Sequence, residues 1–229
     1  MNLLTHLKKN KMPNWCSNYI RINGDSKTIS IITEACQRCE GTENRVFQSL
    51  IDIPSHMTSE DYDKDWYDTN VSWFGTKWDI EYSPDIFTFD KTEITLICET
   101  AWSPPIAFLE NLVKQYKGIE AYIFYSEPGV GFAGETKIYR GEDGHVFVDD
   151  DEYPYLEGIY KLDREMFWSE VESYIDNFEC ENNKEEDENG NELPYPDELM
   201  ENYINDYFDF VEEDDRQEII NQLKEQVNG

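Results

Sequence analysis

Five side chains in the first 140 residues combine groups that transfer protons with groups that exclude water. Asp79 and Glu127 carry carboxyl groups, Ser103 carries a hydroxyl group, and Trp78 and Trp102 carry indole rings. A carboxyl group beside an apolar ring loses water, which raises its pKa toward the range that suits general acid or base catalysis. Asp79 and Glu127 are therefore candidates for a catalytic acid and base.

The same five residues also have a structural interpretation. Tryptophans anchor hydrophobic cores, and Asp and Ser side chains form hydrogen bonds at turns. No metal or cofactor motif accompanies them, so we favour the structural interpretation and assign no catalytic residue and no cofactor. An enzyme with a carboxylate-based site on this part of the chain remains the alternative.

Two further motifs are typical of metal sites but are incomplete. Cys36 and Cys39 have the two-residue gap of a zinc hairpin or a redox pair, yet the sequence holds no second pair. We expect reduced thiols that pack in the core. Glu185 to Gly190 resembles the opening of a calcium loop, but its twelfth position is Pro196, where a bidentate Glu is needed. We therefore expect an acidic linker and assign no metal ligand.

The overall charge excludes several classes of partner. The 229 residues hold 50 acidic and 19 basic side chains, a net charge of −31. Direct electrostatic binding to nucleic acid or anionic lipid needs clustered Lys and Arg. The longest apolar run is about five residues, far below the roughly 20 that span a bilayer, and we find no secretory signal. We expect a cytoplasmic protein that binds no membrane.

The charge is distributed unevenly, which predicts two domains. Residues 1–140 hold 20 acidic and 14 basic side chains, whereas residues 141–229 hold 30 and five. We place the boundary at Gly141, with one domain over residues 12–140 and an acidic helical segment over residues 141–229.

Hydrophobic periodicity predicts an α+β fold for the first domain. Residues 27–39 and 104–116 have helical spacing, and residues 61–73 suggest a long loop. Alternating segments predict strands at residues 17–22, 78–82, 86–89, 93–99, 121–125 and 132–139. The resulting order is β-α-β-β-α-β with additional strands.

The C-terminal segment predicts amphipathic helices. Asp163 is placed to cap the first helix, and Pro196 precedes the second. Their apolar stripes should face inward, and nine carboxylates should form an outward binding surface: Glu165, Glu170, Glu172, Asp176, Glu179, Asp197, Glu201, Asp206 and Asp209. Asp163 to Asp215 holds 21 acids in 53 residues, or one carboxylate per roughly 3.8 Å of helix. Phosphates of one DNA strand are about 3.4 Å apart.

Several ordered motifs carry a resemblance to a known family. They are Met12–Cys16, Gly75–Asp79, Thr100–Pro105, Glu127–Gly129 and Phe132–Gly134. Together they resemble the YubB-type ferredoxin-like domain family of bacteriophages and conjugative plasmids, over residues 12–140. The resemblance implies a ferredoxin-like sandwich, a mobile-element origin and a natural start near Met12. It implies no established activity and transfers no catalytic residue.

These observations favour an interaction protein. We expect an accessory factor of a phage or mobile element that inhibits a basic, nucleic-acid-binding host protein, of the anti-restriction or anti-CRISPR type. Its acidic helices would act by nucleic-acid mimicry in the bacterial cytoplasm, without a cofactor and without binding nucleic acid directly. The alternatives are the enzyme described above, an RNA-binding sheet, and a charge that serves only solubility. The net charge of −6 over residues 1–140 argues against the RNA-binding sheet.

Overall fold

The computed structural model describes residues 14–42, 45–52, 62–182, 184 and 193–228. The chain divides into two compact units, residues 1–151 and residues 152–229, which we call the sheet unit and the helical unit. The charge distribution predicted a boundary after Arg140, whereas the two units divide after Asp151.

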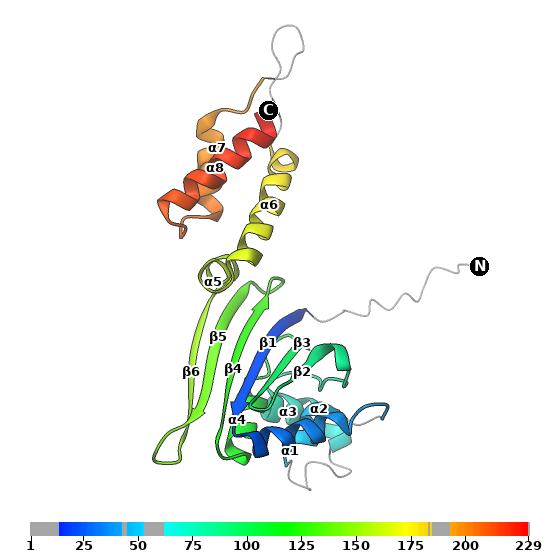
Figure 1. Cartoon of the computed structure of the whole chain (residues 1–229). Coiled ribbons are helices and arrows are strands. Elements are labelled where there is room, and N and C mark those ends of the chain that lie inside the picture. Colours follow the sequence, from blue (N-terminus) through cyan, green and yellow to red (C-terminus); the bar gives the residue numbers. More distant parts are fainter. Residues whose placement is uncertain (1–13, 43–44, 53–61, 183, 185–192, 229) are drawn as a thin grey trace, which may run out of the picture. The chain divides into compact units, whose positions relative to one another are not determined.

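The sheet unit contains a six-stranded antiparallel sheet with the order β2-β3-β1-β4-β5-β6 (Figure 1). The strands are β1 (Trp15–Gly24), β2 (Phe87–Phe89), β3 (Glu93–Ala101), β4 (Ile119–Glu127), β5 (Phe132–Arg140) and β6 (Val146–Pro154). The central strand β1 pairs with β3 on one side and with β4 on the other. The α+β class and the C-terminal helices predicted from the sequence are confirmed.

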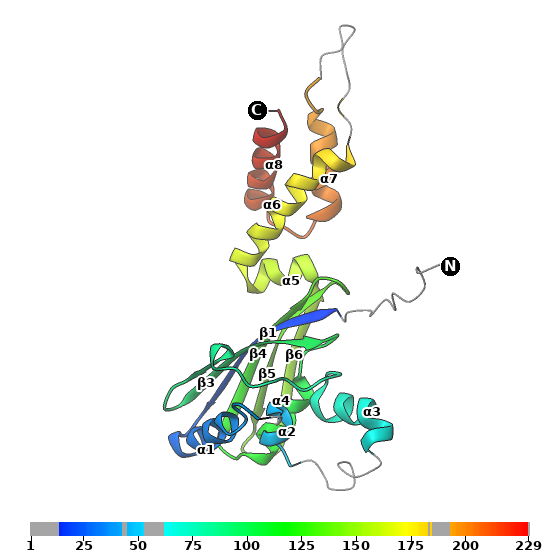
Figure 2. The same cartoon turned by 90° about the vertical axis from the view of Figure 1, so that its right-hand side faces the viewer.

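Four helices pack against the sheet and lie together on one side of it in Figure 2. They are α1 (Ser26–Gln37), α2 (Val46–Leu50), α3 (Tyr62–Phe74) and α4 (Ile106–Gln115), with a short 3-10 turn, η2, at Pro84–Ile86. Strand β1 alternates between buried residues such as Ile20 and exposed residues such as Tyr19. The buried side joins Ile32, Phe47 and Leu109 of the helices in one core. The sheet is therefore covered by helices on one face.

The prediction of a long loop over residues 61–73 was wrong, because α3 occupies most of it. Its inward face includes the buried polar residues Thr69 and Asn70, so the apolar periodicity that marks a helix is weak. The helix ends at Gly75, whose N–H group donates to the carbonyl oxygen of Val71 at 3.0 Å. The φ of +80° at Gly75 suits a residue without a β-carbon.

Two other strand predictions also differ from the structure. Residues 78–82 form only one isolated bridge, between Arg45 and Glu81. Conversely, β6 was not predicted, because it contains four consecutive acids over residues 149–152, and acidic residues are uncommon in strands. Asp150 accepts hydrogen bonds from the hydroxyl groups of Tyr125 (3.1 Å) and Thr136 (2.5 Å), which anchors β6 beside its neighbours.

The helical unit consists of α5 (Tyr155–Leu162), α6 (Arg164–Glu181), α7 (Asp197–Tyr207) and α8 (Glu213–Asn228). Asp163 caps α6 as predicted, since its side chain accepts from the N–H group of Met166 at 3.0 Å. The predicted apolar stripes supply the core, with Phe167, Phe178 and Phe208 completely buried. None of the described helices combines the length and the apolar character that crossing a membrane requires.

Candidate functional site

The segments that contain the sequence motifs meet where β1 begins and β3 ends. The N–H group of Trp102 donates to the carbonyl oxygen of Asn14 at 2.9 Å. The hydroxyl group of Ser103 donates to the carbonyl oxygen of Gly75 at 2.6 Å. Trp102 adopts a φ of +77°, which non-glycine residues rarely adopt. The motifs thus fix the backbone at this junction.

A cleft of about 760 Å³ opens beside this junction. Its lining residues are Trp15, Arg45, Gln48, Trp66, Asn70, Trp78, Asp79, Ile80, Glu81, Ile86, Cys98 and Glu99. The indole rings of Trp15 and Trp78 lie 6.0 Å apart with a tilt of 46°. Both remain substantially exposed, at 40% and 37%. The cleft therefore has an aromatic wall that solvent reaches.

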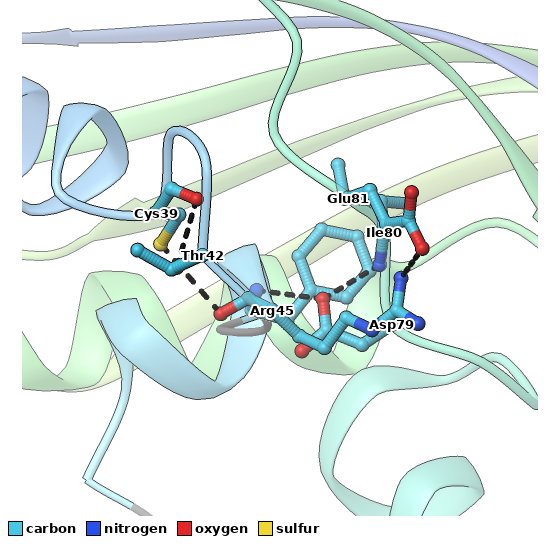
Figure 3. Close-up of polar contacts among 7 residues, drawn as sticks. Cys39, Thr42, Arg45, Asp79, Ile80 and Glu81 are labelled. Atoms are coloured by element: carbon cyan, nitrogen blue, oxygen red, sulfur yellow. Dashed lines mark hydrogen bonds and ion pairs between the residues drawn. The ribbon is translucent and has the colours of Figure 1, made fainter.

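Asp79 lies in this cleft but is bound to the backbone (Figure 3). Its carboxylate accepts from the N–H groups of Phe47 and Gln48, both at 2.8 Å, and from that of Ile80 at 2.7 Å. Helix α2 has no capping side chain from Arg45, the residue at its own N-cap, so Asp79 supplies that function from a distant segment. Burial raises the pKa of Asp79 to about 6, against the opposing effect of these N–H groups.

An ion pair beside Asp79 links Arg45, just before α2, with Glu81. The guanidinium group of Arg45 contacts the carboxylate of Glu81 at 2.5 Å (Figure 3). Both side chains are well exposed, at 44% and 78%, so the pair adds little stability. The Arg45 carbonyl oxygen lies 3.9 Å from the thiol of Cys39, whose own carbonyl oxygen accepts from the Thr42 hydroxyl group at 2.9 Å.

The candidate acid and base do not share the cleft. Glu127 is only 1% exposed and is not among the lining residues. Its carboxylate accepts from the N–H groups of Gly129 and Val130, which stabilises the turn between β4 and β5. The hydroxyl group of Ser103 is likewise bonded to backbone. The geometry thus gives Asp79, Ser103 and Glu127 structural roles.

The cysteine motif lies in the core. Cys36 and Cys39 are both buried, and burial raises the pKa of the Cys36 thiol to about 12. Such a thiol stays protonated and is a poor nucleophile or metal ligand. Across the part of the chain that the structure describes, no group of three or more His, Cys, Asp or Glu residues could hold a metal ion. The calcium-like segment at Glu185 to Gly190 lies outside the described residues.

The second candidate surface is the set of carboxylates on the helical unit. Seven of the nine predicted residues are exposed: Glu165, Glu172, Asp176, Asp197, Glu201, Asp206 and Asp209. Glu170 is half-buried and accepts from the Tyr155 hydroxyl group at 2.9 Å. The side chain of Glu179 lies outside the described residues.

Part of this surface forms a stripe. The spacing of Glu165, Glu172 and Asp176 places them on one face of α6, about 6–10 Å apart along the axis. The average of one carboxylate per 3.8 Å counts every face of the helices. A single face therefore carries charge less densely than a strand of DNA does.

The cleft was only partly predictable from the sequence. Trp78 and Asp79 were selected as candidates, but Trp66 was not, because its segment was taken for a loop. Trp15 belonged to a family motif without being assigned a role. Its outward position in an alternating strand was the signal that could have identified it as a surface aromatic residue.

Comparisons with known proteins give one similar solved structure. The crystal structure of the protein Api92 from Yersinia pseudotuberculosis is similar to this chain, with 13% sequence identity and a TM-score of 0.37. The similarity covers 62% of this chain and 98% of that chain. No curated protein matches the sequence.

A family model gives the assignment. The model described as the ferredoxin-like domain in Api92-like protein matches residues 57–192. This match begins and ends later than the resemblance over residues 12–140 that the motifs indicated, and it spans more than half of the chain. The chain therefore belongs to the family of ferredoxin-like domains in Api92-like proteins.

Proposed function

We propose that this chain is a YubB-type accessory protein of a phage or conjugative plasmid that inhibits a basic, nucleic-acid-binding host protein. The acidic faces of the helical unit make the contact. One observation carries the proposal: the unit holds 25 acidic and five basic side chains, a net charge of −20, and all five basic side chains contact groups of the unit itself.

Two of these basic side chains join one helix to another, and the other three make contacts within a helix or with a connecting segment. Arg164 of α6 bonds to Asp215 of α8 at 2.8 Å, and Lys224 of α8 bonds to Asp197 of α7 at 2.9 Å. Arg216 donates to the carbonyl oxygen of Asp209 in the turn after α7, at 2.8 Å. The remaining two basic side chains are Lys161, which pairs with Glu157, and Lys184, which lies over the ring of Tyr195. Among the exposed carboxylates of the predicted surface, Asp197 pairs with Lys224 and Asp176 accepts from Gln226. The others are the ones that we expect to attract a partner: Glu165, Glu172, Glu201, Asp206 and Asp209.

The core holds these carboxylates in fixed positions. Phe208 contacts the rings of Phe167 and Tyr174, and the hydroxyl group of Tyr203 donates to the Tyr174 carbonyl oxygen at 2.9 Å. A surface that is ordered before binding loses less conformational entropy on association. Long-range attraction between this surface and a basic groove would also speed encounter.

The spacing of the carboxylates on the helices changes the kind of nucleic-acid mimicry that we propose. Each helix face carries carboxylates at wider intervals than phosphates, so the unit is better suited to fill a basic groove as a broad acidic patch. Such a patch competes with nucleic acid through charge and does not reproduce a backbone. The mobile-element resemblance of the motifs favours a defence effector as the target, because such effectors bind invading nucleic acid.

The test compares two variants that lose equal charge. One replaces four exposed acids of the helical unit (Glu165→Gln, Glu172→Gln, Glu201→Gln and Asp209→Asn). The control replaces four acids of the sheet unit (Glu40→Gln, Asp68→Asn, Glu93→Gln and Glu142→Gln). Proteins captured from bacterial lysate by the unmodified chain are identified and purified. Their affinities for the three chains are then measured at low and high salt.

We expect the four-site helical variant to bind its basic partner about 10-fold to 100-fold more weakly. Each lost charge should reduce the binding free energy by roughly 0.3–0.7 kcal/mol. The control should bind within about threefold of the unmodified chain, and added salt should weaken binding. The unmodified chain should also displace DNA from the partner. Equal binding by both variants, or a partner that keeps its DNA, would refute the proposal.

A second candidate function, binding of single-stranded RNA on the sheet, has one observation in its favour. Strand pairing aligns Ile97, Tyr19 and Phe124 across β3, β1 and β4 on the face opposite the helices. Tyr19 and Ile97 are 40% and 58% exposed, and bases stack on such side chains. Fluorescence titration with a uridine oligonucleotide tests this function. Saturable binding that Tyr19→Ala abolishes would support it, and absence of binding at low salt would exclude it.

A further inference from the structure

The geometry points to a binding site for an alkylammonium or guanidinium ion in the cleft beside the beginning of β1. Tryptophans 15, 66 and 78 supply its aromatic surface, and Asp79, Glu81 and Glu99 supply its carboxylates. The site lies among described residues of the sheet unit, so it is independent of the function proposed for the helical unit.

The aromatic surface suits a cation. A cation over the face of an indole ring is attracted by the ring quadrupole, and Trp binds cations best among the aromatic side chains. The centres of the Trp15 and Trp78 rings lie 6.0 Å apart, and both residues stay about two-fifths exposed, which keeps apolar surface open to water. The ammonium group of Lys77 lies 4.4 Å from the centre of the Trp78 ring, so a ligand cation would have to displace Lys77 from this ring or share the ring with it.

The charges around the cleft exclude an anion. Three carboxylates face one guanidinium group among the lining residues, and that group, on Arg45, is paired with Glu81. With Lys77 beside Trp78 counted, the three carboxylates still outnumber the two cations, and because backbone N–H groups hold Asp79, Glu99 is the carboxylate that we expect a ligand to meet. A phosphate or carboxylate ligand would be repelled by these charges. A positively charged organic group would be attracted both by the indole rings and by the carboxylates.

The size of the cleft leaves two sources for the cation. About 760 Å³ falls within the roughly 300–1,000 Å³ of ordinary ligand sites. The ligand can be a free ion of the choline type or the Arg side chain of a peptide. Both present the same chemistry to the rings, so an experiment with one arm for each source separates them.

The first experiment uses the full chain and two small probes of equal shape. Choline carries a quaternary ammonium group, and 3,3-dimethylbutan-1-ol is its neutral counterpart. The second arm uses a short peptide with one Arg and the same peptide with citrulline. Binding is followed by tryptophan fluorescence and by the indole N–H signals in an NMR spectrum of the labelled protein.

Matched variants locate the site. Trp78→Leu removes one ring of the cleft, whereas Trp102→Leu removes a similarly exposed ring, at 43%, that does not line it. Glu99→Gln removes a lining charge, and Glu93→Gln removes a charge on the same face of β3 outside the cleft. Thermal unfolding establishes that each variant is folded. If Trp78→Leu does not fold, the pair of Glu variants makes the same comparison.

We expect a charged probe to bind and its neutral counterpart not to bind. Trp78→Leu should weaken binding about 10-fold and Glu99→Gln about threefold, with less than about twofold for each control. Choline binding identifies a free ion as the ligand class, and binding of the Arg peptide alone identifies a side chain. The inference is overturned if neither charged probe binds, if charged and neutral probes bind equally, or if the controls match the cleft variants.

Discussion

The two units both bury aromatic rings and differ in the rings that they leave at the surface. The sheet unit buries Phe47 and Phe108 among aliphatic residues, and leaves Trp15 and Trp78 partly exposed. The helical unit buries its Phe rings, with Phe208 at the centre of several ring contacts. The sheet unit therefore combines a partly aromatic core with two tryptophans that solvent reaches.

The two units also use charge differently. The sheet unit holds 25 acidic and 14 basic side chains, against 25 and five in a helical unit about half its length. In the helical unit Arg164 and Lys224 each join one helix to another, and acidic side chains outnumber basic ones five to one. The two proposals thus rest on different features, exposed tryptophans in one unit and excess carboxylates in the other.

The largest expected effect tests whether the rings stabilise the helical unit. Phe208→Ala should lower the free energy of unfolding by about 3–5 kcal/mol, since Phe208 is completely buried. Hydrogen exchange should show lost protection in α6, α7 and α8, with β1 and β4 unchanged. Tyr207→Ala, at a site 36% exposed, is the control and should cost about 1 kcal/mol. Loss of protection in both units would contradict the separation.

A pH-dependent effect tests the structural role of Asp79 in the sheet unit. The pKa of Asp79 is raised to about 6 in the folded chain from an ordinary value of 3.8. Its contribution to stability is therefore fully present below pH 3.8 and is lost as the pH rises through 6. The stability of the unmodified chain relative to Asp79→Asn should fall by about 1–2 kcal/mol from pH 4 to pH 7, allowing for solvent screening. Chemical denaturation at each pH measures the difference, and a rise would contradict it.

The smallest effects compare one ion pair from each unit. Arg164→Gln breaks the contact with Asp215 and removes the guanidinium group that lies 4.5 Å from the ring of Tyr160. It should cost about 1 kcal/mol, whereas Glu81→Gln in the exposed pair with Arg45 should cost less than about 0.5 kcal/mol. Denaturation at low and high salt measures both, and equal costs would remove this distinction between the units.

The helices and strands that were predicted correctly are those whose apolar residues recur at regular helical or strand spacing. Helices α6, α7 and α8 and the strand at residues 93–99 were found because their hydrophobic patterns repeat cleanly, whereas α5 was not predicted. Helix α3 was missed because Thr69 and Asn70 occupy its inner face, and Asn70 is bonded to the carbonyl oxygen of Lys77 at 2.9 Å. A buried polar side chain that bonds to a distant residue interrupts the helical pattern of apolar residues, so the sequence alone does not indicate the helix.

The candidate site was less predictable than the fold. Trp78 and Asp79 are neighbours in the chain, so a short motif could suggest them. Trp15, Trp66 and Glu99 reach the same cleft from three other elements. Only the pairing of β1 with β3 and the packing of α3 bring them together, and both are tertiary features.

Strand β6 has a consequence for self-association. It forms one border of the sheet and carries four successive acids over residues 149–152, while β2 at the other border spans only three residues. A second copy that added its own border strand to β6 would set two rows of like charge against each other. Charge repulsion therefore opposes the addition of a strand at β6, and the short length of β2 opposes it at the other border. High salt would weaken only the repulsion at β6.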